Sequence, residues 1–137
     1  MPMINVMEYV TIASTGNSAD FGDLSETRGN VGALSSSTRG ICGGGREPTF
    51  VNTMEYITIA STGDVTDFGD LTVTRSYLAG VNDITRGVFV GGSTPSVSNV
   101  MDYIAIASTG DATDFGDLLT GKQYHSGLSD SHGGLKG

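Results

Sequence analysis

The stretch Asp102–Leu118 reads DYIAIASTGDATDFGDL, and two earlier stretches of the chain are nearly identical to it. They are EYVTIASTGNSADFGDL, which begins at Glu8, and EYITIASTGDVTDFGDL, which begins at Glu55. Each residue of one copy therefore has an equivalent 47 positions later in the next. A period of roughly 40–50 residues is typical of solenoids, propellers and similar arrays. The sequence predicts a repeat protein.

The repeat extends over almost the whole chain and needs no insertion or deletion. We place the repeats at 5–51, 52–98 and 99–137, within a single repeat domain that spans residues 1–137. The first half of the third repeat is faithful to the others, whereas its second half has drifted.

Each repeat divides into about four short β segments. The first, NVMDYIAIAS in the third copy, has β-branched and aromatic residues on both faces, as a strand within stacked sheets would. It is followed by STGDATDFGD, which is dense in turn residues and leads to a segment around the Phe. In the second copy LTVTRSYLAGV and TRGVFVGG supply two more strand candidates. Since no stretch has the 3.6-residue period of a helix, the predicted fold class is all-β.

Composition and charge exclude several kinds of partner. The 137 residues carry a formal net charge of −8, and 37% of them are hydrophobic, as expected of a folded chain rather than a disordered one. Seven Lys and Arg residues provide no basic surface for nucleic acid or for an anionic membrane. The single cysteine, Cys42, excludes an intrachain disulfide. We expect no nucleic-acid partner, no membrane segment and no secretion signal.

The order of features within a repeat resembles the blade of a kelch-type β-propeller. An apolar strand ends in Gly91 and Gly92, a Tyr follows at 103, an aromatic at Phe115, and a basic residue at Lys122. The preceding copy has the same order, in Gly43, Gly44, Tyr56, Phe68 and Arg75. The sequence departs from the kelch pattern because it has Phe where Trp is usual and a longer Tyr-to-Phe spacing. The resemblance implies propeller blades of about 47 residues, three per chain.

A closer, phrase-level resemblance covers all three copies. The pattern YITIASTGDATDFGDL followed by TRGVFVGG is similar to arrays in structural proteins of marine bacteriophages, cyanophages in particular. This resemblance implies a virion component, of tail or fibre, and it implies no enzymatic activity. A cytoplasmic location is the alternative.

The boundaries of the repeat predict which strands of a blade residues 5–24 and 122–137 form. Residues 5–24 would form the last two strands of one blade, and residues 122–137 the first two strands of another. Three blades are too few for a ring, because propellers typically have 4–8. We predict a homodimer that closes a six-bladed ring, with residues near Tyr9 pairing with residues near Tyr124 of the second chain. A piece of a longer ring and an open stack or solenoid are the alternatives.

Acidic residues recur at a spacing of three, and oxygen-rich turns of this kind can bind Ca²⁺. The set comprises Asp64, Asp67, Asp70, Asp111, Asp114 and Asp117, with Asn17, Asp20 and Asp23 in the first copy. They match no calcium-binding loop, so we interpret them as residues that bond the backbone of turns. The predicted sites therefore include no metal.

The remaining reactive side chains form no catalytic set. Recurrent arginines, which we expect to pair with the recurring aspartates, are Arg28, Arg39, Arg75 and Arg86. His125 and His132 accompany Asp130 and Ser131 in the divergent copy, and we interpret both histidines as solvated. Cys42 stands where the next copy has Phe89, which predicts a small core residue. No catalytic, cofactor-binding or metal-binding residue is assigned, and no cofactor is expected.

These observations favour a non-enzymatic, structural or adhesive propeller module that contacts a host-surface glycan or other virion proteins. Two alternatives from other classes stay open: a cellular protein-interaction module of kelch type, and a carbohydrate-active enzyme on a propeller scaffold. We also expect Phe21, Phe68 and Phe115 to be buried at equivalent positions of successive blades.

Overall fold

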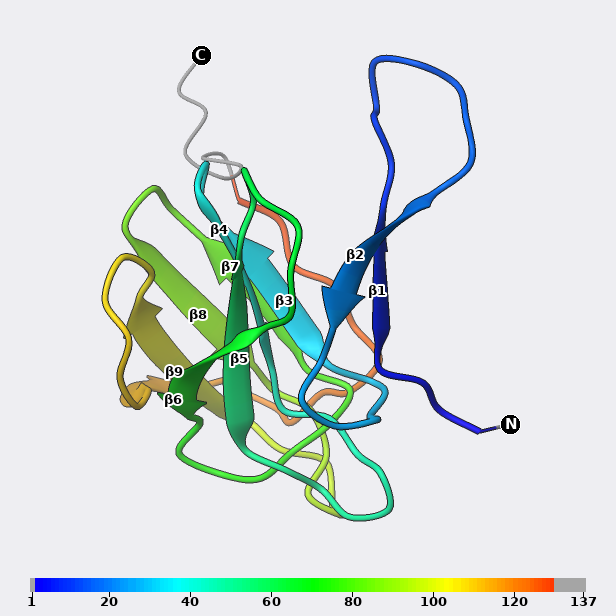
Figure 1. Ribbon diagram of the computed structural model, residues 1–137. Helices are drawn as coiled ribbons and strands as arrows, with labels where there is room; N and C mark the ends of the chain where they lie inside the picture. The colour runs from blue at the N-terminus through cyan, green and yellow to red at the C-terminus, as the bar shows by residue number, and fades with distance from the viewer. Residues whose placement is uncertain (1, 130–137) are drawn as a thin grey trace.

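The computed structural model describes residues 2–129, which form ten strands in three antiparallel sheets and, within that range, no helix (Figure 1). The strands are β1 Val6–Tyr9, β2 Ala19–Asp23, β3 Gly32–Ser35, β4 Arg39–Gly43, β5 Thr53–Thr58, β6 Thr66–Asp70, β7 Ala79–Asn82, β8 Arg86–Val90, β9 Val100–Ala105 and β10 Thr113–Asp117. The all-β prediction is confirmed. None of the described residues belongs to a helix that could cross a membrane.

Two of the sheets are four-stranded and are copies of each other. One has the order β3-β4-β5-β6 and the other β7-β8-β9-β10, so each is a simple meander of neighbouring hairpins. Each strand of the second sheet begins 47 residues after its equivalent in the first. The sequence period therefore corresponds to one four-stranded sheet, whose strands occupy residues 32–70 in the first case and 79–117 in the second.

A β-bulge interrupts the outer hairpin of each sheet at the same place. Met54 pairs with Gly69 and Glu55 with Asp67, which leaves Phe68 as the extra residue on β6. The glycine after the phenylalanine has a positive φ of 137°, a conformation that side chains rarely adopt. The bulge explains why a Phe-Gly pair recurs in the middle of what would otherwise be an alternating strand.

The core lies between the two four-stranded sheets, where β3 runs beside β7 (Figure 1). Close approach is possible because glycines stand at the contact: a Cβ on Gly80 would collide with the carbonyl oxygen of Ala33. The core side chains come from both sheets and from the turns that follow them: Leu34, Ile41, Met54, Phe68, Leu71, Leu78, Phe89, Ile104 and Ile106. Each sheet thus supplies the apolar cover that the other lacks.

The N-terminal hairpin β1-β2 is a separate two-stranded sheet, equivalent to β5-β6 without the two strands that should precede it. Only β2 pairs with β1 among residues 2–129, so the other edge of β1 has no strand beside it there. Residues 5–24 do contain a pair of strands, as the sequence predicts. At the other end, residues 122–129 contain no strand, and the rest of the predicted segment lies outside the described residues.

The described residues form no closed ring of sheets, and the blade count and the dimer stay predictions. One predicted equivalence between repeats was wrong. The glycines equivalent to Gly91 and Gly92 are Gly44 and Gly45, one position later than we expected, and all four have positive φ.

The three repeat phenylalanines are not equally buried. Phe21 is 9% exposed and Phe68 2%, so the prediction is confirmed for these two. Phe115 is 47% exposed, and its predicted burial was wrong. The turn that covers Phe21 or Phe68 belongs to the following repeat, whereas no turn among residues 2–129 bonds the backbone of Phe115.

Candidate functional site

The turn between the two strands of an outer hairpin, β5-β6 or β9-β10, contacts the sheet that precedes it in the sequence. We call this contact a repeat seam. At the first seam the amide of Gly63 donates to the carbonyl of Phe21 over 2.7 Å. The Asp23 amide donates to Oδ1 of Asp64 over 3.0 Å, and the Val65 amide donates to the Asp23 carbonyl over 3.0 Å. The aspartate carboxylate thus bonds a backbone amide of the neighbouring repeat.

The second seam reproduces the first, bond for bond. Gly110 donates to the carbonyl of Phe68 over 2.7 Å, and Asp70 donates its amide to Oδ1 of Asp111 over 3.0 Å. The Ala112 amide then donates to the Asp70 carbonyl over 2.8 Å. Two of the recurrent aspartates therefore have the backbone-bonding role that the sequence predicts, although they act between repeats rather than within one turn.

A buried ion pair ties the connection between sheets to the sheet that follows. Arg75 lies fully buried before β7, and its Nη2 is 2.7 Å from Oδ2 of Asp102 on β9. It also donates to the carbonyls of Phe89, Gly91 and Val100. Burial lowers the pKa of Arg75, and the Asp102 carboxylate opposes that shift. The arginine fork thus satisfies four acceptors at the end of two strands.

The equivalent pair in the preceding sheet is Arg28 with Glu55, at 2.7 Å. Ser25 and Thr72 occupy equivalent positions, and each hydroxyl donates to the carboxylate of its own sheet, Ser25 to Glu55 and Thr72 to Asp102. Arg28 and Arg75 do form ion pairs, but the predicted partners, the recurring aspartates, were wrong. Their partners are the acids of β5 and β9, however, and not the aspartates of the turns.

The other two recurrent arginines make no carboxylate pair among the described residues. The guanidinium of Arg39 lies 4.3 Å from the centre of the Tyr56 ring, and that of Arg86 lies 4.5 Å from the centre of the Tyr103 ring. Arg39 also donates to the carbonyl of Ile106. For these residues the predicted aspartate partner was wrong, because a tyrosine face on the neighbouring strand is nearer.

Three residues with a left-handed backbone conformation recur at equivalent positions of the repeats, and we call them the left-handed row. Asn30, Tyr77 and Tyr124 have φ of 62°, 59° and 55° and occupy equivalent positions 47 residues apart. The Tyr77 amide donates to the Asn30 carbonyl, and the Tyr124 amide to the Tyr77 carbonyl. The two tyrosine rings lie 4.2 Å apart, and interaction with Tyr77 raises the pKa of Tyr124. Such backbone conformations cost energy in residues other than glycine and persist where surrounding contacts fix them.

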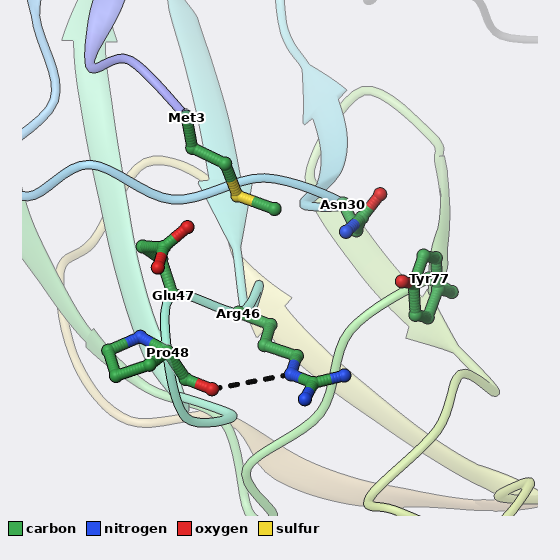
Figure 2. Close-up of a pocket in the computed structure, with 6 residues that line it drawn as sticks. All are labelled: Met3, Asn30, Arg46, Glu47, Pro48 and Tyr77. Carbon is green, nitrogen blue, oxygen red and sulfur yellow. Dashed lines mark hydrogen bonds between the residues drawn. The ribbon is translucent and has the colours of Figure 1, made fainter. Parts of the chain in front are cut away.

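An open pocket of about 300 Å³ lies beside this row (Figure 2). Figure 2 shows its lining residues, which are Met3, Asn30, Arg46, Glu47, Pro48 and Tyr77. The Arg46 side chain is held by a 3.3 Å bond from Nε to the Pro48 carbonyl, and its guanidinium lies 5.0 Å from the centre of the Phe50 ring. The Glu47–Pro48 peptide bond is cis. Both charged residues are exposed to solvent.

The pocket offers hydrogen-bonding groups of every kind beside one aromatic side chain. Arg46 supplies donors, Glu47 acceptors, Asn30 both, and Tyr77 a hydroxyl and a ring. This set suits a ligand with many hydroxyl groups and a partly apolar face, such as a sugar. It holds no nucleophile with a neighbouring base, which covalent or acid–base catalysis would require.

The remaining candidates of the sequence lie apart from this pocket. Cys42 is half-buried on β4, where burial raises the pKa of its thiol and Arg28 opposes the shift, so the thiol stays protonated at neutral pH.

The ring nitrogens of His125 are buried without a hydrogen-bond partner among the described residues, so the prediction that this histidine is solvated was wrong. His125 occupies the position of Leu78 in the preceding repeat and fills its space against Gly91. His132, Asp130 and Ser131 lie outside the described residues. No group of three potential metal-ligating side chains occurs in the part of the chain that the structure describes.

Sequence reasoning missed the pocket. Its residues come from three loops and the N-terminal segment, and only the equivalence of Asn30 and Tyr77 was visible as a spacing of 47. A comparison of every equivalent position, rather than of the identical ones, would have shown an Asn-Tyr-Tyr series and pointed to the left-handed row, since Asn is enriched in that conformation.

No protein-family model matches the chain, and no curated protein sequence matches it.

Proposed function

We propose that this chain is a non-enzymatic structural module whose sheets are kelch-like propeller blades. The sheets within 32–70 and 79–117 are two complete blades. A third is assembled from β1-β2 and the C-terminal residues of a second copy, which gives a six-bladed ring from two chains. The observation that carries this proposal is the seam, which joins successive sheets through the same set of bonds twice.

The contacts of the charged residues support a scaffold rather than a catalyst. Arg28, Glu55, Arg75 and Asp102 are buried in ion pairs that fix the connections between sheets. Asp64 and Asp111 bond backbone amides across the seams. Side chains that serve such contacts are not free to act on a substrate.

We place the module in a phage virion, as part of a tail or fibre, because whole phrases of the repeat resemble those of marine phage structural proteins. Mass spectrometry of purified phage particles tests the location. Peptides of this chain in the particle would support it, whereas their presence in the host cytoplasm alone would favour a cellular interaction module of kelch type.

An adhesive role would use the pocket beside Asn30 and Tyr77, with a surface glycan as ligand. The test is binding of the full chain to an array of bacterial surface polysaccharides, followed by titration of the strongest ligand. We expect Tyr77→Ala and Arg46→Ala each to weaken binding about tenfold, the effect of losing roughly 1.4 kcal/mol. Arg86→Ala is the matched control, since it removes the same charge from a different face.

Two results would contradict the adhesive role. One is the absence of binding to any polysaccharide by the folded chain, and the other is unchanged binding by both pocket variants. Melting temperatures measured alongside would show that the variants are folded.

A further inference from the structure

Two segments of the described chain each carry one half of a repeat seam. Phe115, Gly116 and Asp117 repeat the residues that receive a turn in the first two seams, and no turn among residues 2–129 bonds their backbone. The turn at residues 12–18 repeats the turns at 59–65 and 106–112, and it makes no equivalent bond to another described sheet. Ile12 in that turn is 96% exposed.

Gly116 has the space that the second half of a seam would fill. A Cβ on Gly22 or on Gly69 would collide with the carbonyl of the docked glycine, Gly63 or Gly110 respectively. A Cβ on Gly116 would meet only the terminal methyl of Met101, at 3.9 Å. The three glycines share a positive φ, so the same surface is formed each time, and among residues 2–129 only the surface at Gly116 has no turn against it.

The N-terminal turn has the groups that this surface binds. The amide of Gly16 is equivalent to the Gly63 and Gly110 amides, which donate to the phenylalanine carbonyl. Asn17 stands where the other turns have Asp64 and Asp111, and its Oδ1 can accept the same backbone amide bond. A Cβ on Gly16 would have nothing within 4 Å, as at Gly63 and Gly110, so the same side of each turn is uncovered, although φ of 155° is shared by Gly63 and Gly110 alone among the three.

The charges at the two ends are also complementary. Lys122 is equivalent to Arg28 and Arg75, and its backbone is anchored in the same way, with its amide donating to Ser98 and its carbonyl accepting from Gly92. Glu8 on β1 is equivalent to Glu55 and Asp102. Both Lys122 and Glu8 are exposed here, although their equivalents are buried in ion pairs. Leu119 replaces the hydroxyl residue of the other two sites, so this pair would lack the additional hydroxyl bond.

We propose that a second copy of this chain completes a third seam. The turn at 12–18 of one chain docks on Phe115–Asp117 of the other, with Gly16 donating to the Phe115 carbonyl and Lys122 pairing with Glu8. This inference rests on the proposed stacking of blades and adds the contacts that hold two chains together. Because the described residues of each chain supply both halves of a seam, two chains related by a two-fold axis can form two such seams.

The test is the solution mass of the full chain and of variants at the two ends. We expect the wild type to have twice the mass of one chain. Phe115→Asp and Lys122→Glu should each weaken association by about 30-fold or more, as loss of a central interface residue does. Combining Lys122→Glu with Glu8→Lys should restore the association. The matched controls are Ile84→Ser, an exposed apolar residue elsewhere, and Glu26→Lys, an exposed charge elsewhere; both should leave the mass unchanged.

The possible results distinguish the proposed third seam from the proposed six-bladed ring. A larger closed assembly that Phe115→Asp breaks up would support the third seam and overturn the six-bladed ring. A dimer that neither end variant affects would overturn the seam and leave the ring standing. A monomer at every concentration tested would overturn both. Circular dichroism of each variant shows whether it is folded, and Phe115 and Lys122 are exposed enough in the single chain for their substitution to leave the fold intact.

Discussion

Phe68 and Phe115 lie in identical local sequences, TDFGDL, and their surroundings differ. Both extend from a bulge on the outer strand, and both meet a tyrosine of the adjacent strand edge to face, with ring centres 6.0 and 6.2 Å apart. Phe68 is covered by the turn of the third repeat and is 2% exposed, whereas Phe115 is 47% exposed. The local sequence fixes the conformation of the hairpin in both cases. The neighbouring repeat decides whether the side chain is buried.

The largest effect on stability should come from removing the buried cation Arg75, which pairs with Asp102 on β9. Arg75→Met leaves Asp102 buried without its cation and removes the Arg75 hydrogen bonds to three carbonyls, so we expect a loss of about 3–5 kcal/mol in unfolding free energy. Arg28→Met should cost less, because each carboxylate keeps its hydroxyl donor and the Arg28 side chain bonds Glu55 and the Cys42 sulfur rather than backbone carbonyls. Urea denaturation of both variants measures the difference. Equal costs would show that the backbone carbonyls contribute little.

The phenylalanine comparison itself can be measured by truncation. Phe68→Ala should cost about 3–5 kcal/mol, the usual result for a fully buried Phe. Phe115→Ala should cost less than about 1 kcal/mol when the chain is diluted to the monomer, since nearly half of that side chain is already in water. Equal losses in urea denaturation would mean that the single chain buries Phe115 by another route.

Glycine substitutions isolate the seam from backbone strain. Gly69 and Gly116 have φ of 137° and 129°, so a Cβ strains both backbones to a similar degree. Only at Gly69 does it also collide with the carbonyl of Gly110. Gly69→Ala should therefore destabilise the monomer by about 1–3 kcal/mol more than Gly116→Ala does, the usual range for forced overpacking. A difference near zero would contradict the described seam.

The smallest effect concerns the turns between the first two strands of each sheet. Asp83 accepts the amides of Thr85 and Arg86, and these bonds lower its pKa, whereas the equivalent Ser36 accepts the amides of Thr38 and Arg39 without a charge. Because the folded pKa is depressed, the contribution of Asp83 is complete above its unfolded pKa of about 3.9. It is lost as the pH falls through the folded value. Asp83→Ser should reduce this acid sensitivity and change neutral stability by less than about 0.5 kcal/mol. An unchanged pH profile of stability below pH 4 would show that the carboxylate contributes nothing beyond what serine supplies.

The repeat spacing predicted equivalent hairpins, because identical local sequences adopt the same conformation, and the β-rich segments without a helical period predicted the all-β class. The recurrence of Arg28 and Arg75 predicted ion pairs, although with the recurring aspartates of the turns. It missed Glu55 and Asp102 as the partners, since nothing in a linear pattern shows which acid faces the arginine across two strands. The pocket beside Tyr77 was invisible for the same reason: loops from separate parts of the chain form it. His125 was misjudged because its polar neighbours in sequence hide the fact that its position is that of a buried leucine.

The central claim is that one kind of seam is used twice within the chain and once between chains. Amide hydrogen exchange of the three equivalent turn glycines tests it most directly. Gly63 and Gly110 donate to the carbonyls of the buried residues Phe21 and Phe68, so their amides should exchange slowly at every protein concentration. The Gly16 amide should exchange rapidly in dilute solution and become as slow as the other two when the chains associate. Rapid exchange of Gly16 in a chain shown to be dimeric, or exchange of Gly63 as fast as that of Gly16, would contradict the account.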